Sequence, residues 1–180
     1  LNKLSMTLDP MAPEGREIVR KLVKTAYVVV ATLPPQTLAA MGLDYDSLKA
    51  VKPDIILTTV SAYGRGGPYS DRVGFDSVGQ TMSGAVYMTG TTEQPYRAAV
   101  PWVDFGTALH TAFGTLLALM ARKQTGKGQM VEGALLATAV TLTNAMLIEQ
   151  AVIQIDREPT ANRGQTSAPS DLFRTKDGWN

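Results

Sequence analysis

The chain has 180 residues, of which 44% are hydrophobic and 18% are charged, and its formal net charge is +1. This balance is typical of a folded globular protein, and it excludes intrinsic disorder and collagen-like or low-complexity chains. The near-neutral charge, without any run of Lys or Arg, predicts that the partners include neither nucleic acid nor a membrane surface.

The first third of the chain predicts alternating strands and helices. The elements expected from hydrophobic spacing are a short strand at 5–9, a helix that begins at Pro13, a strand at 27–31, short helices at 36–40 and 46–51, and a strand at 54–60. The strand at 27–31 is a continuous run of mostly β-branched residues, which is typical of a strand buried on both faces of a parallel sheet. This order predicts the α/β class.

The remainder is richer in helices. After a Gly/Pro-rich loop at 62–69, the expected elements are a helix at 76–87, a helix at 104–123, a strand at 129–133, a helix at 134–155 and a hairpin strand at 171–178. The segment 104–123 is apolar almost all round, so we expect its neighbours to bury it. Asp104, His110 and Arg122 interrupt it too often for a membrane span. We expect three segments, 1–65, 66–155 and 156–180.

Few residues offer metal-binding or nucleophilic chemistry. The absence of cysteine excludes disulfides, thiolate catalysis and cysteine-based metal sites, and His110 is the only histidine, so we expect no metal site. We expect His110 to be partly buried with its hydrogen bonds satisfied. The turn at 64–67 is glycine-rich enough to form an anion-binding nest, but it lacks the spacing of known phosphate loops, which favours a plain surface turn.

Asp104 stands before the most apolar helix and allows two interpretations. A carboxylate there can serve as the N-cap of the helix. The positive end of the helix dipole also favours the ionised form, and an ionised carboxylate among apolar residues can act as a nucleophile. The two roles are compatible, and periodicity alone does not choose between them.

Several short motifs, in order and at compatible spacing, resemble the family III CoA-transferases, a group that includes the α-methylacyl-CoA racemases. They lie at 7–9 and 13–17, 41–43, 66–76, 125–129, 161–164 and 175–179. The resemblance implies a Rossmann-like open parallel sheet, a CoA-binding large domain over 1–65, a catalytic segment with buried helices over 66–155, and a linker to a small domain over 156–180. It also implies a fragment of a longer chain that is inactive by itself, because the family's glycine-rich loop falls after Asn180.

In this family a nucleophilic aspartate precedes the apolar helix that ends in a TGKGQ-like turn, and Asp104 matches that position. The resemblance therefore implies transfer of CoA between an acyl-CoA and a small carboxylic acid through a covalent aspartyl intermediate. It implies CoA or acyl-CoA as substrate with no permanently bound cofactor, and an interlocked homodimer. The absence of a secretory signal favours a cytoplasmic location.

The CoA-binding residues implied by the resemblance fall in three groups. They are Leu8, Asp9, Pro10 and Met11; Thr32, Leu33 and Pro34; and Arg72, Val73, Gly74, Phe75 and Asp76. Many members have an arginine in the turn that is here 32–36, and Arg72 is the candidate substitute. The racemases need a histidine where this chain has Phe75, which disfavours racemase chemistry. A non-catalytic acyl-CoA-binding module is the other alternative.

Overall fold

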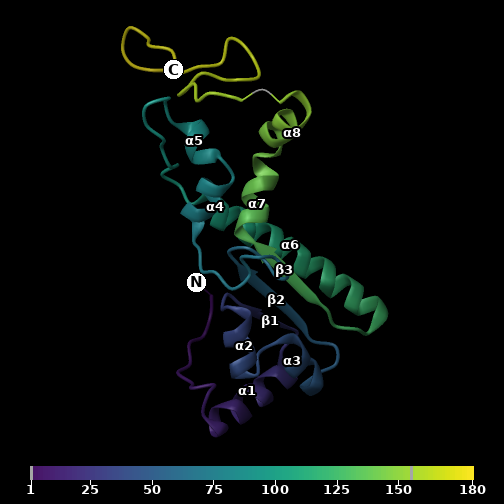
Figure 1. The fold of residues 1–180 in the computed structure, drawn as a ribbon. Helices are drawn as coiled ribbons and strands as arrows, with labels where there is room; N and C mark the ends of the chain where they lie inside the picture. The colour runs from purple at the N-terminus through teal and green to yellow at the C-terminus, as the bar shows by residue number, and fades with distance from the viewer. Residues whose placement is uncertain (1, 155) are drawn as a thin grey trace. The chain divides into compact units, whose positions relative to one another are not determined.

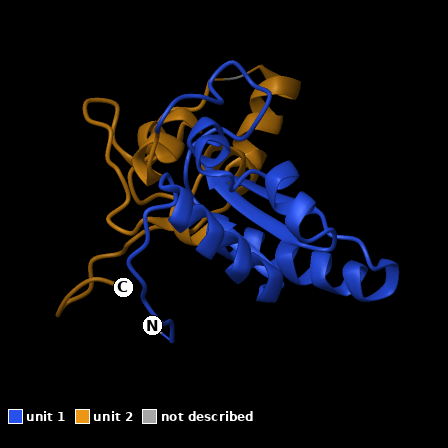
Figure 2. Cartoon of the chain, turned by 90° about the horizontal axis from the view of Figure 1, so that it is seen from below, with its two compact units in different colours: residues 1–73, 107–134 blue, residues 74–106, 135–180 orange. Residues whose placement is uncertain are grey.

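The structure is a computed structural model that describes residues 2–154 and 156–180, and its contacts divide the chain into two compact units (Figure 2). Unit 1 contains residues up to 73 together with 107–134, and unit 2 contains 74–106 and 135–180. This division differs from the three consecutive segments expected from the sequence. The reason is that the chain returns to the sheet of unit 1 after residue 106.

Unit 1 is an α/β layer structure around a three-stranded parallel sheet of order β1-β2-β3 (Figure 1). Its elements are α1 (Pro13–Thr25), β1 (Val28–Ala31), α2 (Pro35–Met41), α3 (Tyr45–Val51), β2 (Ile56–Ser61), residues 107–125 of α6 (Trp102–Thr125) and β3 (Met130–Ala134). The predicted α/β class and the strands expected at 27–31, 54–60 and 129–133 are confirmed, and the three strands are parallel. The strand expected at 5–9 is wrong, since these residues form no regular structure.

The two faces of the sheet have different neighbours because successive residues of a strand point to opposite sides. Leu57 of β2 packs with Val23 of α1 and Leu48 of α3 in a buried cluster. On the other face the hydroxyl of Thr58 lies 2.6 Å from that of Thr115 in α6. Helices α1 and α3 therefore cover one face and α6 covers the other.

Helix α6 turns small residues toward the sheet. Thr107, Thr111 and Ala118 are buried, and a Cβ added to Gly133 of β3 would lie 2.2 Å from Cγ2 of Thr111, so helix and strand are in close contact. The expectation that the neighbours bury the apolar residues of α6 is wrong for this chain. Its large side chains point away from the sheet and are exposed, among them Leu109 (72%), Phe113 (64%), Leu116 (59%) and Met120 (64%).

These four residues, called the α6 apolar stripe below, recur at helical spacing on the face opposite the buried threonines. Among the described residues, α6 is the one helix long and apolar enough to cross a membrane, judged by length and composition; the bent pair α7 and α8 would qualify as one span. In unit 1, α6 lies along the sheet, as a core helix of a layered protein does. That the protein has no membrane partner stays a prediction.

Unit 2 contains shorter helices: α4 (Asp76–Met82), α5 (Ala85–Thr89), the first turn of α6, α7 (Leu135–Leu142) and α8 (Asn144–Ile153). The single helix expected at 76–87 is divided at Gly84, whose φ of 82° is left-handed. The helix expected at 134–155 bends by 68° between α7 and α8, and its predicted end at residue 155 lies outside the described residues. Near the C-terminus, Arg174 and Trp179 form an antiparallel bridge, which agrees with the expected hairpin.

Candidate active site

Asp104 lies in the first turn of α6, in unit 2, one residue after the fully buried Val103. The helix begins at Trp102, so Asp104 is its third residue and not its N-cap. The Asp104 side chain is exposed, and its carboxylate accepts no hydrogen bond from any described residue. It is therefore an acceptor with free lone pairs at the start of a helix.

Asp76, the first residue of α4, takes the capping role in place of Asp104. Its Oδ2 accepts hydrogen bonds from the backbone N–H groups of Val103 at 2.9 Å and of Asp104 at 3.1 Å. These N–H groups belong to the first turn of α6, where no carbonyl of the helix can accept from them. Asp76 is 6% exposed, so its carboxylate is a buried cap supplied by a distant part of the chain.

Gln80 completes this network from the next turn of α4. Its Nε2 donates a short hydrogen bond to Oδ1 of Asp76, and its Oε1 accepts from the backbone N–H of Ala98 at 3.0 Å. The Ala98 contact fixes which end of the Gln80 amide faces Asp76. All three partners of Asp76 are then donors, which is the environment that an ionised carboxylate requires.

The charge of Asp76 acts on Asp104. Partial burial of Asp104 and the nearby Asp76 carboxylate raise the pKa of Asp104 above its ordinary value of 3.8. Both effects disfavour the ionised form, by loss of hydration and by like-charge repulsion. The expected stabilisation by the helix dipole is therefore opposed by the residue that caps the helix.

The CoA-binding residues expected in unit 1 lie on either side of α2. Thr32, Leu33 and Pro34 connect β1 to this helix, and Pro34 is its N-cap. Leu8, Asp9, Pro10 and Met11 precede α1, where Asp9 Oδ1 accepts from the backbone N–H of Met11 at 2.8 Å. Arg16 links this second segment to the far end of α2 by donating to the carbonyls of Pro10 and Ala40. The two groups therefore lie at opposite ends of a helix about 10 Å long.

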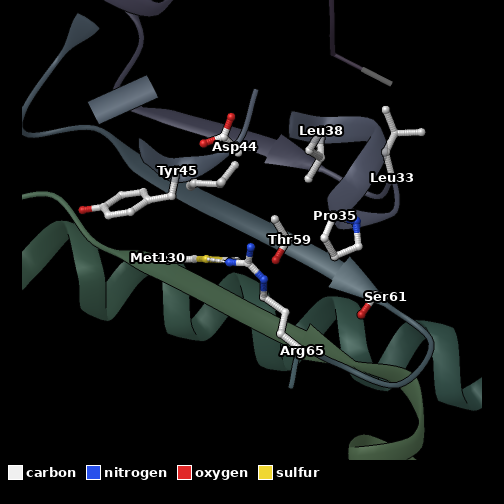
Figure 3. Close-up of a pocket in the computed structure, with 10 residues that line it drawn as sticks. Leu33, Pro35, Leu38, Asp44, Tyr45, Thr59, Ser61, Arg65 and Met130 are labelled. Carbon is white, nitrogen blue, oxygen red and sulfur yellow. Dashed lines mark hydrogen bonds between the residues drawn. The ribbon is translucent and has the colours of Figure 1, made fainter. Parts of the chain in front are cut away.

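A small pocket of about 20 Å³ lies on the face of the sheet covered by α2 and α3, and its lining runs from Met130 at the start of β3 to Ser61 at the end of β2 (Figure 3). Leu33, Thr59, Ser61 and Arg65 are among the residues that line it. The Arg65 side chain extends over the sheet, and its Nη1 lies 2.9 Å from Sδ of Met130. No described carboxylate lies within 4.0 Å of its guanidinium, so Arg65 is a cation beside the turn that lacks the expected arginine.

Sequence reasoning missed Arg65 and named Arg72 instead. The Arg72 guanidinium lies 4.3 Å from the ring centroid of Tyr69, in the loop that follows β2. The sequence contained no signal for Arg65 beyond the glycines beside it, because only the fold brings the end of β2 next to the end of β1. The role of Arg72 in CoA binding stays a prediction.

The third expected group continues into unit 2. Val73 is the last residue of unit 1, and Gly74, Phe75 and Asp76 begin unit 2. Val73 and Phe75 are exposed, at 70% and 72%, whereas the Asp76 carboxylate is buried and accepts three hydrogen bonds. Direct contact between CoA and the Asp76 carboxylate stays an untested prediction.

Two further sequence interpretations concern ligands. His110 is exposed, so the expectation that it is partly buried is wrong. The described residues contain no group of three or more His, Cys, Asp or Glu able to hold a metal ion.

Comparison with known proteins decides the family. The sequence profile described as CoA-transferase family III matches residues 1–180. The chain belongs to CoA-transferase family III. The expected family membership is thus confirmed.

The curated relatives of this family III chain include several transferases. It is 35% identical over 178 residues to the succinyl-CoA–D-citramalate CoA-transferase of Chloroflexus aurantiacus, covering 98% of this chain and 44% of the relative. It is 31% identical over 180 residues to the human succinyl-CoA:glutarate CoA-transferase, covering 99% of this chain and 41% of the relative. The family III chain thus spans less than half the length of these relatives.

Solved structures of similar proteins agree with the fold. A CAIB/BAIF family protein from Brucella suis superposes with a TM-score of 0.88 at 32% identity, over 97% of this chain and 47% of the other. A protein from Mycobacterium tuberculosis gives a TM-score of 0.85 at 29% identity, over 99% and 47%. The family III chain therefore has the fold of one part of these larger proteins.

Proposed function

We propose that the protein containing this chain is a CoA-transferase that moves CoA between an acyl-CoA and a free carboxylic acid, with Asp104 as the covalent nucleophile. The observation that carries the proposal is the position of Asp104: an exposed carboxylate without a hydrogen-bond partner among the described residues, in the first turn of the helix that precedes the TGKGQ turn. A carboxylate that only capped a helix would be bonded to backbone N–H groups, as Asp76 is.

The first half-reaction forms and breaks bonds at two carbonyl carbons. A carboxylate oxygen of Asp104 attacks the thioester carbonyl, and the C–S bond breaks. CoA departs as the thiolate, and the donor acyl group is now joined to Asp104 as a mixed anhydride. The thiolate then attacks the Asp104 carbonyl of the anhydride, so the donor acid leaves as a carboxylate and Asp104 becomes a CoA thioester. No proton is transferred, and the intermediates stay close in energy because Asp104 and the two acids are all carboxylates.

The second half-reaction reverses these steps with another acid. The acceptor carboxylate attacks the aspartyl thioester and displaces CoA thiolate, which then attacks the acceptor acyl carbon of the new anhydride. Asp104 is released as a carboxylate and the acceptor leaves as its acyl-CoA. The cycle needs CoA only as part of the substrate, with no resident cofactor.

The class of acid is proposed from the relatives. The names of the two relatives described above contain succinyl-CoA together with citramalate or glutarate. A further relative, from Rhodopseudomonas palustris and 35% identical, is named a formyl-CoA:oxalate CoA-transferase. Because citramalate, glutarate, oxalate and the acid of succinyl-CoA are dicarboxylic acids, we place this protein among transferases for small dicarboxylic acids. Succinyl-CoA is accordingly the first donor to test.

The test is intact-mass analysis of the full-length protein after incubation with succinyl-CoA, without an acceptor acid. We expect the protein to gain the mass of one CoA less one water, and to lose this adduct on treatment with hydroxylamine, which cleaves the aspartyl thioester. Asp104→Ala and Asp104→Asn should show no adduct while still binding CoA. An adduct that persists in both variants would place the nucleophile elsewhere. CoA binding with no adduct from any acyl-CoA would favour a non-catalytic binding module.

We further propose that the functional unit is a homodimer in the cytoplasm. The α6 apolar stripe supports a partner, since four large apolar side chains on one helix face are exposed in this chain. The stripe is long and continuous enough for a helix packing surface. The proposed occupant is a second copy of the protein, interlocked with the first.

A further inference from the structure

Asp76 and Gln80 connect three segments of unit 2 through one buried network. Asp76 joins the start of α4 to the first turn of α6, and Gln80 joins α4 to the loop that precedes α6 through Ala98. Both side chains are buried, with Gln80 1% exposed. The network therefore holds both the beginning of α6 and the segment leading to it.

Close packing supports the same arrangement. A Cβ added to Gly79 of α4 would lie 2.8 Å from Cγ1 of Val103, the residue before Asp104. Val103 is fully buried. Hydrogen bonds to the backbone of Val103 and this close contact with its side chain, both made by α4, leave the first turn of α6 little freedom to rotate or shift.

We propose that Asp76 is a positioning residue for Asp104: its buried carboxylate, oriented by Gln80, fixes the backbone from which the Asp104 nucleophile projects. This inference rests on the proposed function, since it concerns the same nucleophile. It assigns Asp76 a role different from direct contact with CoA. The oxygens of Asp76 already accept three hydrogen bonds, two on Oδ2 and one on Oδ1, within a buried site.

Such positioning matters because the nucleophile must approach the thioester carbonyl along one direction. A carboxylate displaced by about 1 Å from a productive geometry loses on the order of 100-fold in rate. The charge of Asp76 has a second, separable effect on the protonation of Asp104. Asp76 is the only titratable residue of α4; α7, which packs against α4, has none, and α5 has only the exposed Tyr87.

The test exchanges the two partners of the Asp76–Gln80 hydrogen bond. Asp76→Asn places an amide donor against the Nε2 donor of Gln80. The Gln80 amide cannot rotate to present its oxygen instead without losing the hydrogen bond from the Ala98 backbone N–H. Gln80→Glu places two acceptors against each other. The double variant Asp76→Asn/Gln80→Glu restores a donor and an acceptor and keeps the total charge, but it moves the negative charge away from the first turn of α6.

The readouts are the single-turnover rate of CoA-adduct formation across pH, and the Kd for CoA, in the full-length protein. For Asp76→Asn we expect the rate on its high-pH plateau to fall by about 10-fold to 100-fold, with Kd unchanged. In the double variant the plateau rate should recover to within about 3-fold of wild type, because the hydrogen bond between positions 76 and 80 that each single variant breaks is restored. Its pH midpoint should nevertheless lie below that of wild type, because less negative charge remains near Asp104.

Asp46→Asn is the matched control, since Asp46 is an exposed carboxylate in the first turn of another helix, α3. It removes one charge at a helix start without touching the network. We expect its rate and pH midpoint to equal those of wild type.

Several results would overturn the inference while leaving the proposed function intact. One is an unchanged plateau rate in Asp76→Asn. Another is a weakened Kd for CoA with a normal rate at saturation, which would make Asp76 a CoA contact. Failure of the double variant to recover, although circular dichroism shows it folded, would also contradict the inference. The proposed function fails separately if wild type forms no adduct or Asp104→Ala still forms one.

Discussion

Arg122, in the last turn of α6, forms an ion pair with Asp54, which lies two residues before the buried first residue of β2, Ile56. Nε of Arg122 donates to Oδ2 of Asp54 at 2.9 Å, and Nη2 of Arg122 forms a second, shorter contact with the same oxygen. The Arg122 guanidinium also lies 5.0 Å from the ring centroid of Tyr27, just before β1. The ion pair therefore connects the C-terminal end of α6 to the end of the sheet at which β1 and β2 begin.

The pair makes stability depend on pH. The hydrogen bond and charge of Arg122 hold the pKa of Asp54 below its ordinary value of 3.8. A carboxylate with a lowered folded-state pKa stabilises the fold at pH values above its unfolded pKa, and this contribution is lost as pH falls through the folded value. We expect Arg122→Gln to lower the thermal midpoint at pH 7, and the part of this difference that comes from the ion pair to shrink below pH 3.8 and to be lost below the lowered pKa of Asp54. Lys123→Gln, on the exposed neighbour, should change neither.

Asp104 should have the opposite effect on stability. Its pKa is raised, so the folded state binds its proton more tightly than the unfolded chain does, and ionisation above that pKa opposes folding. Asp104→Asn should therefore raise the thermal midpoint of the full-length protein at pH 7 while abolishing the adduct. At a pH below 3.8 the gain should disappear, since Asp104 is then protonated in both states. A destabilised variant at pH 7 would contradict a raised pKa.

Gly133 is a position where any side chain meets α6. An added Cβ would lie 2.2 Å from Cγ2 of Thr111 and 3.1 Å from Cγ2 of Thr107. Overpacking of this kind costs about 1–3 kcal/mol, so Gly133→Ala should lower the free energy of unfolding by that amount in denaturant titrations. Thr111→Ser removes the nearest methyl group but keeps the hydroxyl that donates to Thr107, so it should recover most of the loss.

The control for this experiment is Gly67→Ala. An added Cβ at Gly67 has its nearest contact at 4.0 Å, and its φ is not left-handed. Loss of unfolded-state backbone entropy makes Gly→Ala stabilising where the φ is compatible, so equal destabilisation by both substitutions would show that contact with α6 does not explain the effect.

The α6 apolar stripe predicts the response of the assembly to added charge. Phe113→Glu places a carboxylate in the middle of the stripe, and burial of a phenylalanine contributes about 1.5–3 kcal/mol before any cost of burying charge. We expect the dimer dissociation constant of the full-length protein to rise by about 100-fold, measured by light scattering over a concentration series. Gln124→Glu, an exposed polar position of the same helix, is the control. A wild-type protein that is monomeric at all concentrations would contradict the proposed homodimer.

The sequence by itself determined the local elements and the family. Continuous β-branched runs predicted β1 and β2, and short-range spacing predicted α2, α3 and the extent of α6, because these signals depend on neighbours within a few positions. The family motifs were likewise readable in order along the chain, and the sheet class followed from the alternation of strands and helices.

Only the tertiary structure decided which groups meet. The sequence offered Asp104 as the cap of α6, but the cap is Asp76, 27 positions before Val103. It indicated a helix buried all round, but the sheet contacts the threonine face and leaves the large side chains exposed. Periodicity describes one element at a time and contains no information about its partner. Caps and buried faces are set by contacts between distant segments, and these exist only after the chain has folded.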